Sequence, residues 1–291
     1  MKISMYANFS TLVDEIGIEG AADAALCGGC NAVEFIDIDT RDSFVPNEKS
    51  ALEYKHVLDS KGLSVPCYSI GLNLCLPNDD TFDSTDALKR IAHSAKMASL
   101  LGSPFLHHTL IRSVSYNPAT HVRDFDKVLE KLIPLACEAA DICNSLGLTV
   151  LYEPQGMYVN GSENFSAFYN EMKRTGKRVG VCGDMGNSLF CDWRPEDFYS
   201  KFASEIRHVH AKDYKLADAK DISPKTHAYT SMAGKKIIPT LFGDGDIDVA
   251  YCLRTVREAG ICKSVSLEGE YGNLKEEMLH DVAVIKRLFE K

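Results

Sequence analysis

Short runs of β-branched and aromatic residues alternate along the chain with longer segments whose apolar residues recur at helical spacing. The short runs are typical of buried strands, and the 3.6-residue period is typical of amphipathic helices. The pattern predicts eight strands, at Ile3–Asn8, Ala32–Ile36, Ser64–Ile70, Pro104–Thr109, Thr149–Glu153, Arg178–Gly183, Ile206–Lys212 and Ser264–Glu268. It predicts helices at Thr11–Leu26, Glu48–Ser60, Thr85–Leu101, Thr120–Leu146, Glu163–Thr175, Pro195–Phe202, Asp248–Ala259 and Leu274–Glu290.

Strands that alternate with helices imply a parallel sheet with right-handed crossovers. An open, doubly wound sheet should carry a Gly-rich phosphate turn after its first strand, but here Asn8-Phe9-Ser10-Thr11 follows. The pattern therefore favours one (β/α)8 TIM barrel, of class α/β, that spans residues 1–291 as a single domain. The longest connection without a clear period is 213–246, between strands seven and eight, and connections of that length are often functional lids.

Composition narrows the classes of partner. The 291 residues are 45% hydrophobic and 25% charged, as in a soluble globular protein, and the formal net charge is −9. An acidic chain is a poor electrostatic match to nucleic acid or to an anionic membrane surface, which leaves small polar molecules as ligands. The ten cysteines are scattered and no signal-peptide pattern precedes them, so we expect free thiols in the cytoplasm.

Ionisable residues stand at the ends of predicted strands five to eight. Active sites of (β/α)8 barrels lie at the C-terminal ends of the strands, and these four ends carry Glu153, Asp184, His210 and Glu268. Three carboxylates and one imidazole at one rim would repel each other unless a cation neutralised them. The donor set predicts one divalent ion, with Mn²⁺ or Mg²⁺ favoured and Co²⁺ or Zn²⁺ left open.

Further histidines are candidates for substrate binding. His208 lies two residues before His210, so both side chains face the same side of their strand. The alternative for His208 is packing lower in the barrel. His107 and His108 are adjacent at the end of predicted strand four, so one points inward and the other outward. The sequence does not determine which of the two faces the site.

Three other polar residues have both a binding and a structural interpretation. Lys212 either binds a substrate oxygen or pairs with Asp213. Glu34, flanked by apolar residues in the second predicted strand, is a candidate for binding a sugar hydroxyl or an Arg. Asn187 either orients substrate or caps the turn after strand six. Glu270 lies beyond Glu268 and is expected to be a solvated loop residue.

Several short motifs at these strand ends resemble those of the xylose isomerase-like superfamily, in particular its sugar phosphate isomerase/epimerase group, which includes the tagatose and psicose 3-epimerases. The resemblance covers roughly residues 2–290. Its motifs are Tyr152-Glu153-Pro154, Gly183-Asp184-Met185-Gly186-Asn187, Val209-His210-Ala211-Lys212-Asp213, Gly243-Asp244-Gly245-Asp246-Ile247-Asp248 and Ser266-Leu267-Glu268.

The resemblance implies a metal held by Glu153, Asp184, His210 and Glu268, with the two glutamates as the acid/base pair. It implies isomerisation or epimerisation of a sugar or sugar-like polyol ketone, and the family's frequent dimers and tetramers leave a homo-oligomer open. The chain departs from the epimerases at Asn187, where those enzymes carry a His that contacts substrate, and at Lys212-Asp213.

Three alternatives remain open. The same site could run a lyase reaction, namely dehydration of a keto-inositol or of dehydroshikimate, or cleavage of a 3-keto-C-glycoside. The superfamily also includes an AP-endonuclease with three zinc ions, but the net charge of −9 and the lack of clustered Arg argue against that activity. The third alternative is a non-catalytic sugar-binding subunit.

Overall fold

The fold is taken from a computed structural model that describes residues 1–38, 45–77, 79, 81–112, 125–223 and 225–290. Nine parallel strands form a nearly closed barrel in the order β2-β1-β12-β8-β7-β6-β5-β4-β3. Their bounds are β1 Lys2–Met5, β2 Ala32–Val33, β3 Phe35–Ile38, β4 Tyr68–Gly71, β5 Phe105–His108, β6 Thr149–Tyr152, β7 Val179–Asp184, β8 Ile206–Ala211 and β12 Ser264–Leu267. The predicted (β/α)8 barrel is confirmed.

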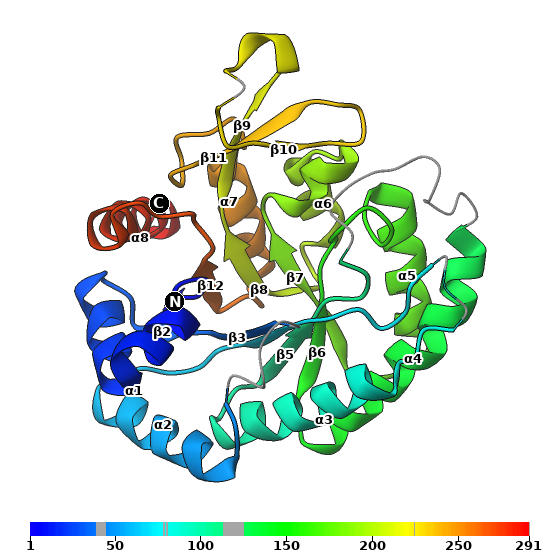
Figure 1. Cartoon of the computed structure of the whole chain (residues 1–291). Coiled ribbons are helices and arrows are strands. Elements are labelled where there is room, and N and C mark those ends of the chain that lie inside the picture. Colours follow the sequence, from blue (N-terminus) through cyan, green and yellow to red (C-terminus); the bar gives the residue numbers. More distant parts are fainter. Residues whose placement is uncertain (39–44, 78, 80, 113–124, 224, 291) are drawn as a thin grey trace.

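The helices lie outside the barrel, as Figure 1 shows. They are α1 Phe9–Cys27, α2 Glu48–Ser60, α3 Thr85–Leu100, α4 Phe125–Ser145, α5 Ser162–Arg174, α6 Pro195–Phe202, α7 Val249–Ala259 and α8 Leu274–Glu290. The predicted bounds of α2, α6 and α8 agree with the structure, and the predicted start of α4, at 120–124, lies outside the described residues. None of the described helices combines the length and apolar character that crossing a membrane requires.

One predicted strand is divided at Glu34. Its first half, β2, pairs with β1, and its second half, β3, pairs with β4, so the two halves join the ends of the barrel sheet. Glu34 itself still donates its backbone N–H to Met5. Within the barrel, Cys67, Leu151 and Cys182 form a small apolar cluster. Side chains that fill a barrel in this way leave the chemistry to its C-terminal rim.

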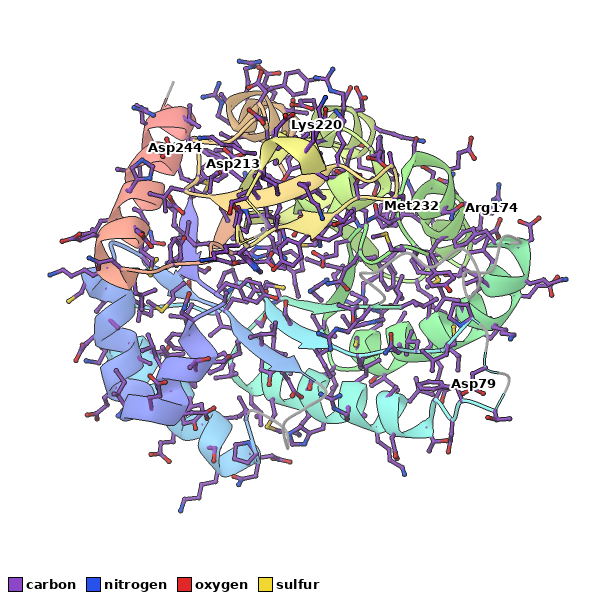
Figure 2. All side chains as sticks on the ribbon, turned by 45° about the horizontal axis from the view of Figure 1, so that its top comes forward. Asp79, Arg174, Asp213, Lys220, Met232 and Asp244 are labelled. Carbon is purple, nitrogen blue, oxygen red and sulfur yellow. The ribbon has the colours of Figure 1, made fainter. Side chains whose placement is uncertain are left out.

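The connection after β8 contains a second sheet that the sequence pattern did not predict. Strands β9 (Asp213–Ala217), β10 (Tyr229–Thr230) and β11 (Lys236–Thr240) pair antiparallel in the order β10-β11-β9. Figure 2 marks its two ends at Asp213 and Met232. Strand β10 has only two residues, and β9 and β11 contain exposed or half-buried positions instead of a continuous buried apolar run. The sequence pattern therefore carries little signal for this sheet.

Candidate functional site

The structure brings the four predicted strand-end residues together. Glu153 directly follows β6, Asp184 ends β7, His210 lies in β8 and Glu268 directly follows β12. His210 Nδ1 lies 3.2 Å from Glu153 Oε2 and 3.5 Å from Glu268 Oε2. Asp184, His210 and Glu268 each offer one ligand atom, and these atoms lie within 4.8 Å of one another. Parallel strands place their C-terminal ends at one rim, which explains the convergence.

Lys212 adds a positive charge to this group. Its Nζ lies 2.8 Å from Asp184 Oδ2 and 3.1 Å from Glu268 Oε2. Of its two interpretations, the pairing with Asp213 is not found in the described structure, where Asp213 accepts hydrogen bonds from the backbone N–H groups of Gly243 and Gly245. Although burial opposes the charge, Asp184 and Glu268 hold the pKa of Lys212 well above its usual range.

Asn187 ties two of the carboxylates to the turn after β7. Its backbone N–H and that of Gly186 donate to Asp184 Oδ1 at 2.6 and 2.8 Å. Its side-chain amide donates to Glu153 Oε1 at 3.1 Å. The backbone contact fits the interpretation that Asn187 caps the turn, and the amide orients a carboxylate of the site. Its predicted contact with substrate stays a prediction.

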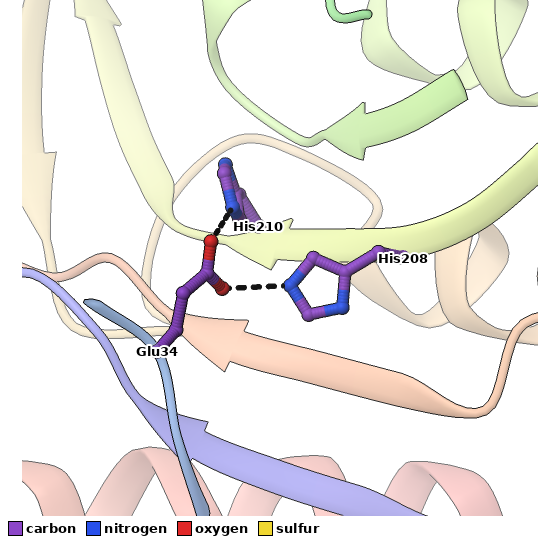
Figure 3. A group of neighbouring side chains, drawn as sticks. All are labelled: Glu34, His208 and His210. Carbon is purple, nitrogen blue, oxygen red and sulfur yellow. Dashed lines mark hydrogen bonds and ion pairs between the residues drawn. The ribbon is translucent and has the colours of Figure 1, made fainter. Parts of the chain in front are cut away.

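Glu34 is fully buried between two histidines (Figure 3). His208 Nε2 lies 2.8 Å from Glu34 Oε2, and His210 Nε2 lies 3.2 Å from Glu34 Oε1. The hydroxyls of Ser69 and Ser266 each donate to this carboxylate at 2.5 Å. Burial works to raise the pKa of Glu34, but the two histidines hold it well below its usual range. Its partners in the structure are histidines and serines and not an Arg, and the contact with a sugar hydroxyl stays a prediction.

The two adjacent histidines of β5 point in opposite directions. His107 faces the site, with Nε2 3.5 Å from Glu153 Oε1. The ring of His108 instead meets that of Tyr152 edge-on at 5.3 Å, and Tyr152 packs against Phe168 of α5. His108 thus lies in the layer between sheet and helices, so the structure does not bring this candidate into the site. Burial lowers the pKa of His108 to about 4.

A cavity of about 160 Å³ opens beside the carboxylates. Glu153, Glu268 and His107 line it, together with Tyr6, Arg112 and Gln155, which the sequence analysis did not single out. The Tyr6 ring stacks on that of His210, with centroids 4.6 Å apart. Tyr6 directly follows β1, but the predicted strand Ile3–Asn8 placed it inside the strand, so the strand-end rule did not point to it.

The remaining polar candidate lies outside this group. Glu270 is exposed, accepts a hydrogen bond from Tyr229 Oη at 2.7 Å and lies 3.2 Å from His227 Nε2. It is the surface residue that the sequence predicted, although it has partners in the small sheet and in the connection before it.

The donor set fits a divalent cation. Asp184 Oδ2 and Glu268 Oε2 are buried, and neither has a hydrogen-bond partner of adequate geometry among the described residues, although Lys212 lies within ion-pair distance of both. Buried carboxylate oxygens without such partners are costly unless a cation or a donor satisfies them. Together with His210 Nδ1 they form the mixed oxygen and imidazole set that suits Mn²⁺, Mg²⁺ or Zn²⁺.

The nearly closed parallel barrel and the acidic site at its C-terminal rim place the protein among (β/α)8 barrels with a candidate cation site. The family described as xylose isomerase-like TIM barrel matches residues 21–288, and the chain belongs to it. A comparison with curated protein sequences finds no significant match.

Solved structures share the fold over almost the whole chain. An L-ribulose 3-epimerase is 15% identical with a TM-score of 0.73, covering 99% of this chain and 94% of its own. The IOLI protein with a bound zinc atom is 13% identical with a TM-score of 0.72, covering 100% and 98%. The probable 3-DHS dehydratase AsbF from Bacillus anthracis is 15% identical with a TM-score of 0.71, covering 98% and 99%. At these identities the likeness concerns the fold.

Proposed function

We propose that this protein is a divalent-metal-dependent isomerase or epimerase of a sugar or sugar-like polyol ketone. The observation that carries the proposal is the convergence of Glu153, Asp184, His210 and Glu268 beside a cavity. These four residues would hold the ion, for which we favour Mn²⁺ or Mg²⁺. A bound divalent ion supplies a Lewis acid that offsets negative charge on the oxygens of an enediolate.

Glu153 is the stronger candidate for the base that removes a proton beside the carbonyl. Burial works to raise its pKa, but His107 and His210 hold it below the usual range, so the group is a carboxylate at neutral pH. Asn187 and His107 fix its orientation from one side. A carboxylate positioned in this way typically contributes roughly 10²–10⁴-fold to proton transfer.

Glu268 is the proposed partner that returns the proton. It lines the same cavity, and its side chain is 26% exposed, whereas that of Glu153 is 3% exposed. The two carboxylates therefore differ in access to solvent, which suits one group that keeps the substrate proton and one that exchanges it with water. Reprotonation at the same carbon gives epimerisation, and reprotonation at the neighbouring carbon gives isomerisation.

We also propose a cytoplasmic location and a small polyol or ketose as the partner molecule. All ten cysteines are free in the structure, which fits a reducing compartment. A homo-oligomer stays a proposal that rests on the family alone.

Proton exchange tests the reaction. The Mn²⁺-loaded protein is incubated in D₂O with ketoses, aldoses, inososes and 3-keto-glycosides, and the products are followed by NMR. We expect deuterium at a carbon beside the carbonyl of one substrate class, and loss of this exchange in Glu153→Gln and Glu268→Gln. Glu270→Gln is the matched control, because it removes an exposed carboxylate two residues from Glu268.

Two results would count against the proposal. New alkene or cleavage products would assign a lyase reaction to the same site. Absence of exchange with every compound, in a protein that binds the ion, would refute the reaction as stated and favour a sugar-binding role.

A further inference from the structure

Lys212 is the residue of the site whose role the proposed reaction leaves unexplained. It follows β8 directly, two residues after His210, so the strand carries both side chains toward the same rim. Only 8% of its side chain is exposed. A lysine buried to this extent is unusual unless acidic groups surround it.

The contacts of Lys212 coincide with two of the proposed ion ligands. Its Nζ lies 2.8 Å from Asp184 Oδ2 and 3.1 Å from Glu268 Oε2. Both oxygens lack a hydrogen-bond partner of adequate geometry among the described residues. The ammonium thus offsets the negative charge of the two oxygens without forming a well-oriented hydrogen bond to either. A metal cation that binds ligands from several directions would both offset their charge and bond to each oxygen.

We infer that Lys212 is an internal counter-ion that competes with the divalent ion for Asp184 and Glu268. The inference rests on the ion of the proposed function. In the ion-free protein the ammonium offsets the repulsion between the carboxylates of Asp184 and Glu268, whose facing oxygens Oδ2 and Oε2 are buried. When the ion binds, it must share these oxygens with Lys212 or displace the ammonium, and the nearby positive charge weakens its binding.

This role gives opposite signs for two measurable quantities. Removing the charge of Lys212 leaves Asp184 and Glu268 uncompensated, so the ion-free protein becomes less stable. The same change removes repulsion of the ion, so the ion binds more tightly. A residue with only a packing role would lower stability without improving ion binding. A residue that supports the ligand geometry would weaken ion binding when it is removed.

The test compares wild type, Lys212→Met and Lys215→Met at one fixed pH. Lys215 lies in β9 and is exposed. Lys215→Met removes the same formal charge as Lys212→Met, so it is the matched control. Mn²⁺ affinity is measured by calorimetry, and Tm is measured with EDTA and with saturating Mn²⁺. Lys212→Gln, which retains a donor, serves if the Met variant does not fold.

We expect Lys212→Met to bind Mn²⁺ about tenfold or more tightly than wild type, the scale expected when a unit charge near the ion is removed at a partly shielded site. Its Tm in EDTA should fall, and its gain in Tm on adding Mn²⁺ should exceed that of wild type. Lys215→Met should match wild type in both. Equal or weaker Mn²⁺ binding in the Lys212 variants would overturn the inference.

The outcomes separate this inference from the proposed function. Absence of Mn²⁺ binding in wild type and variants would overturn the inference together with the ion site. Tighter binding in Lys212→Met, in a protein that exchanges no substrate proton, would support the inference and refute the reaction.

Discussion

Replacing Glu34 by Gln tests how the centre of the barrel is held together. The carboxylate of Glu34 is fully buried and accepts from Ser69 and Ser266 while it contacts His208 and His210. Gln keeps the shape but removes the negative charge, and its NH₂ group replaces one acceptor oxygen with a donor. One imidazole and one hydroxyl then face a donor where they had an acceptor.

The magnitude follows from the two imidazole contacts. A hydrogen bond to a charged group contributes roughly 1.5–3 kcal/mol, and breaking a buried ion pair from one side costs about 3–5 kcal/mol. Because Gln retains one acceptor oxygen, we expect the free energy of unfolding to fall by about 3 kcal/mol. His210 also loses the group that orients its ring, so Mn²⁺ affinity should fall by roughly 10–100-fold.

Urea unfolding at pH 7 in EDTA measures the stability term, and calorimetry measures Mn²⁺ binding. Glu270→Gln makes the same chemical change at an exposed carboxylate and should shift the unfolding free energy by less than about 0.5 kcal/mol. NMR should show a changed chemical shift for His210 Nε2, the imidazole nitrogen that faces Glu34. A stability loss no larger than that of the control, with unchanged His210 signals, would refute the account of Glu34 as the charged centre of this network.

Two further substitutions test separate parts of the fold. Burial lowers the pKa of His108 from 6.5 to about 4. Between these pH values the imidazole is protonated in the unfolded chain and neutral in the folded protein. Stability is therefore lost as the pH falls from about 6.5 toward 4. The free energy of unfolding is measured with urea at pH 7 and at pH 4.5. Between these two pH values it should fall by about 2–3 kcal/mol less in His108→Phe than in wild type. Equal losses in the two proteins would contradict the reasoning. In Gly245→Ala the added Cβ would lie 2.1 Å from Asp213 Oδ1 and 2.6 Å from the Tyr214 carbonyl oxygen. We expect the free energy of unfolding to fall by about 1–3 kcal/mol, measured by thermal or urea unfolding. Gly272→Ala is the control, because its Cβ would meet nothing closer than 3.9 Å, and it should unfold like wild type. Similar stabilities for the two variants would disprove the close approach.

Periodicity, together with the missing Gly-rich turn after the first strand, was sufficient to predict the barrel. Each predicted strand lies in the sheet, and α2, α6 and α8 have the predicted bounds. The barrel strands stand out as short runs of β-branched and aromatic residues between longer segments of helical period, and the alternation of strand and helix allows few topologies. The grouping of Glu153, Asp184, His210 and Glu268 followed from the same regularity, because a parallel barrel gathers all strand ends at one rim.

Tertiary structure alone decided which partner each polar side chain takes. Strand alternation predicts that His107 and His108 face opposite sides, but only packing against Tyr152 determines that His108 faces the helices. Glu34 and His208 are 174 positions apart, and nothing local to either residue specifies their contact. Lys212 takes Asp184 and Glu268 rather than its neighbour Asp213, because backbone N–H groups of the distant 243–247 turn already occupy that carboxylate. Sequence pattern determines which face a residue occupies, whereas pairings between distant strands depend on the closed barrel that brings them together.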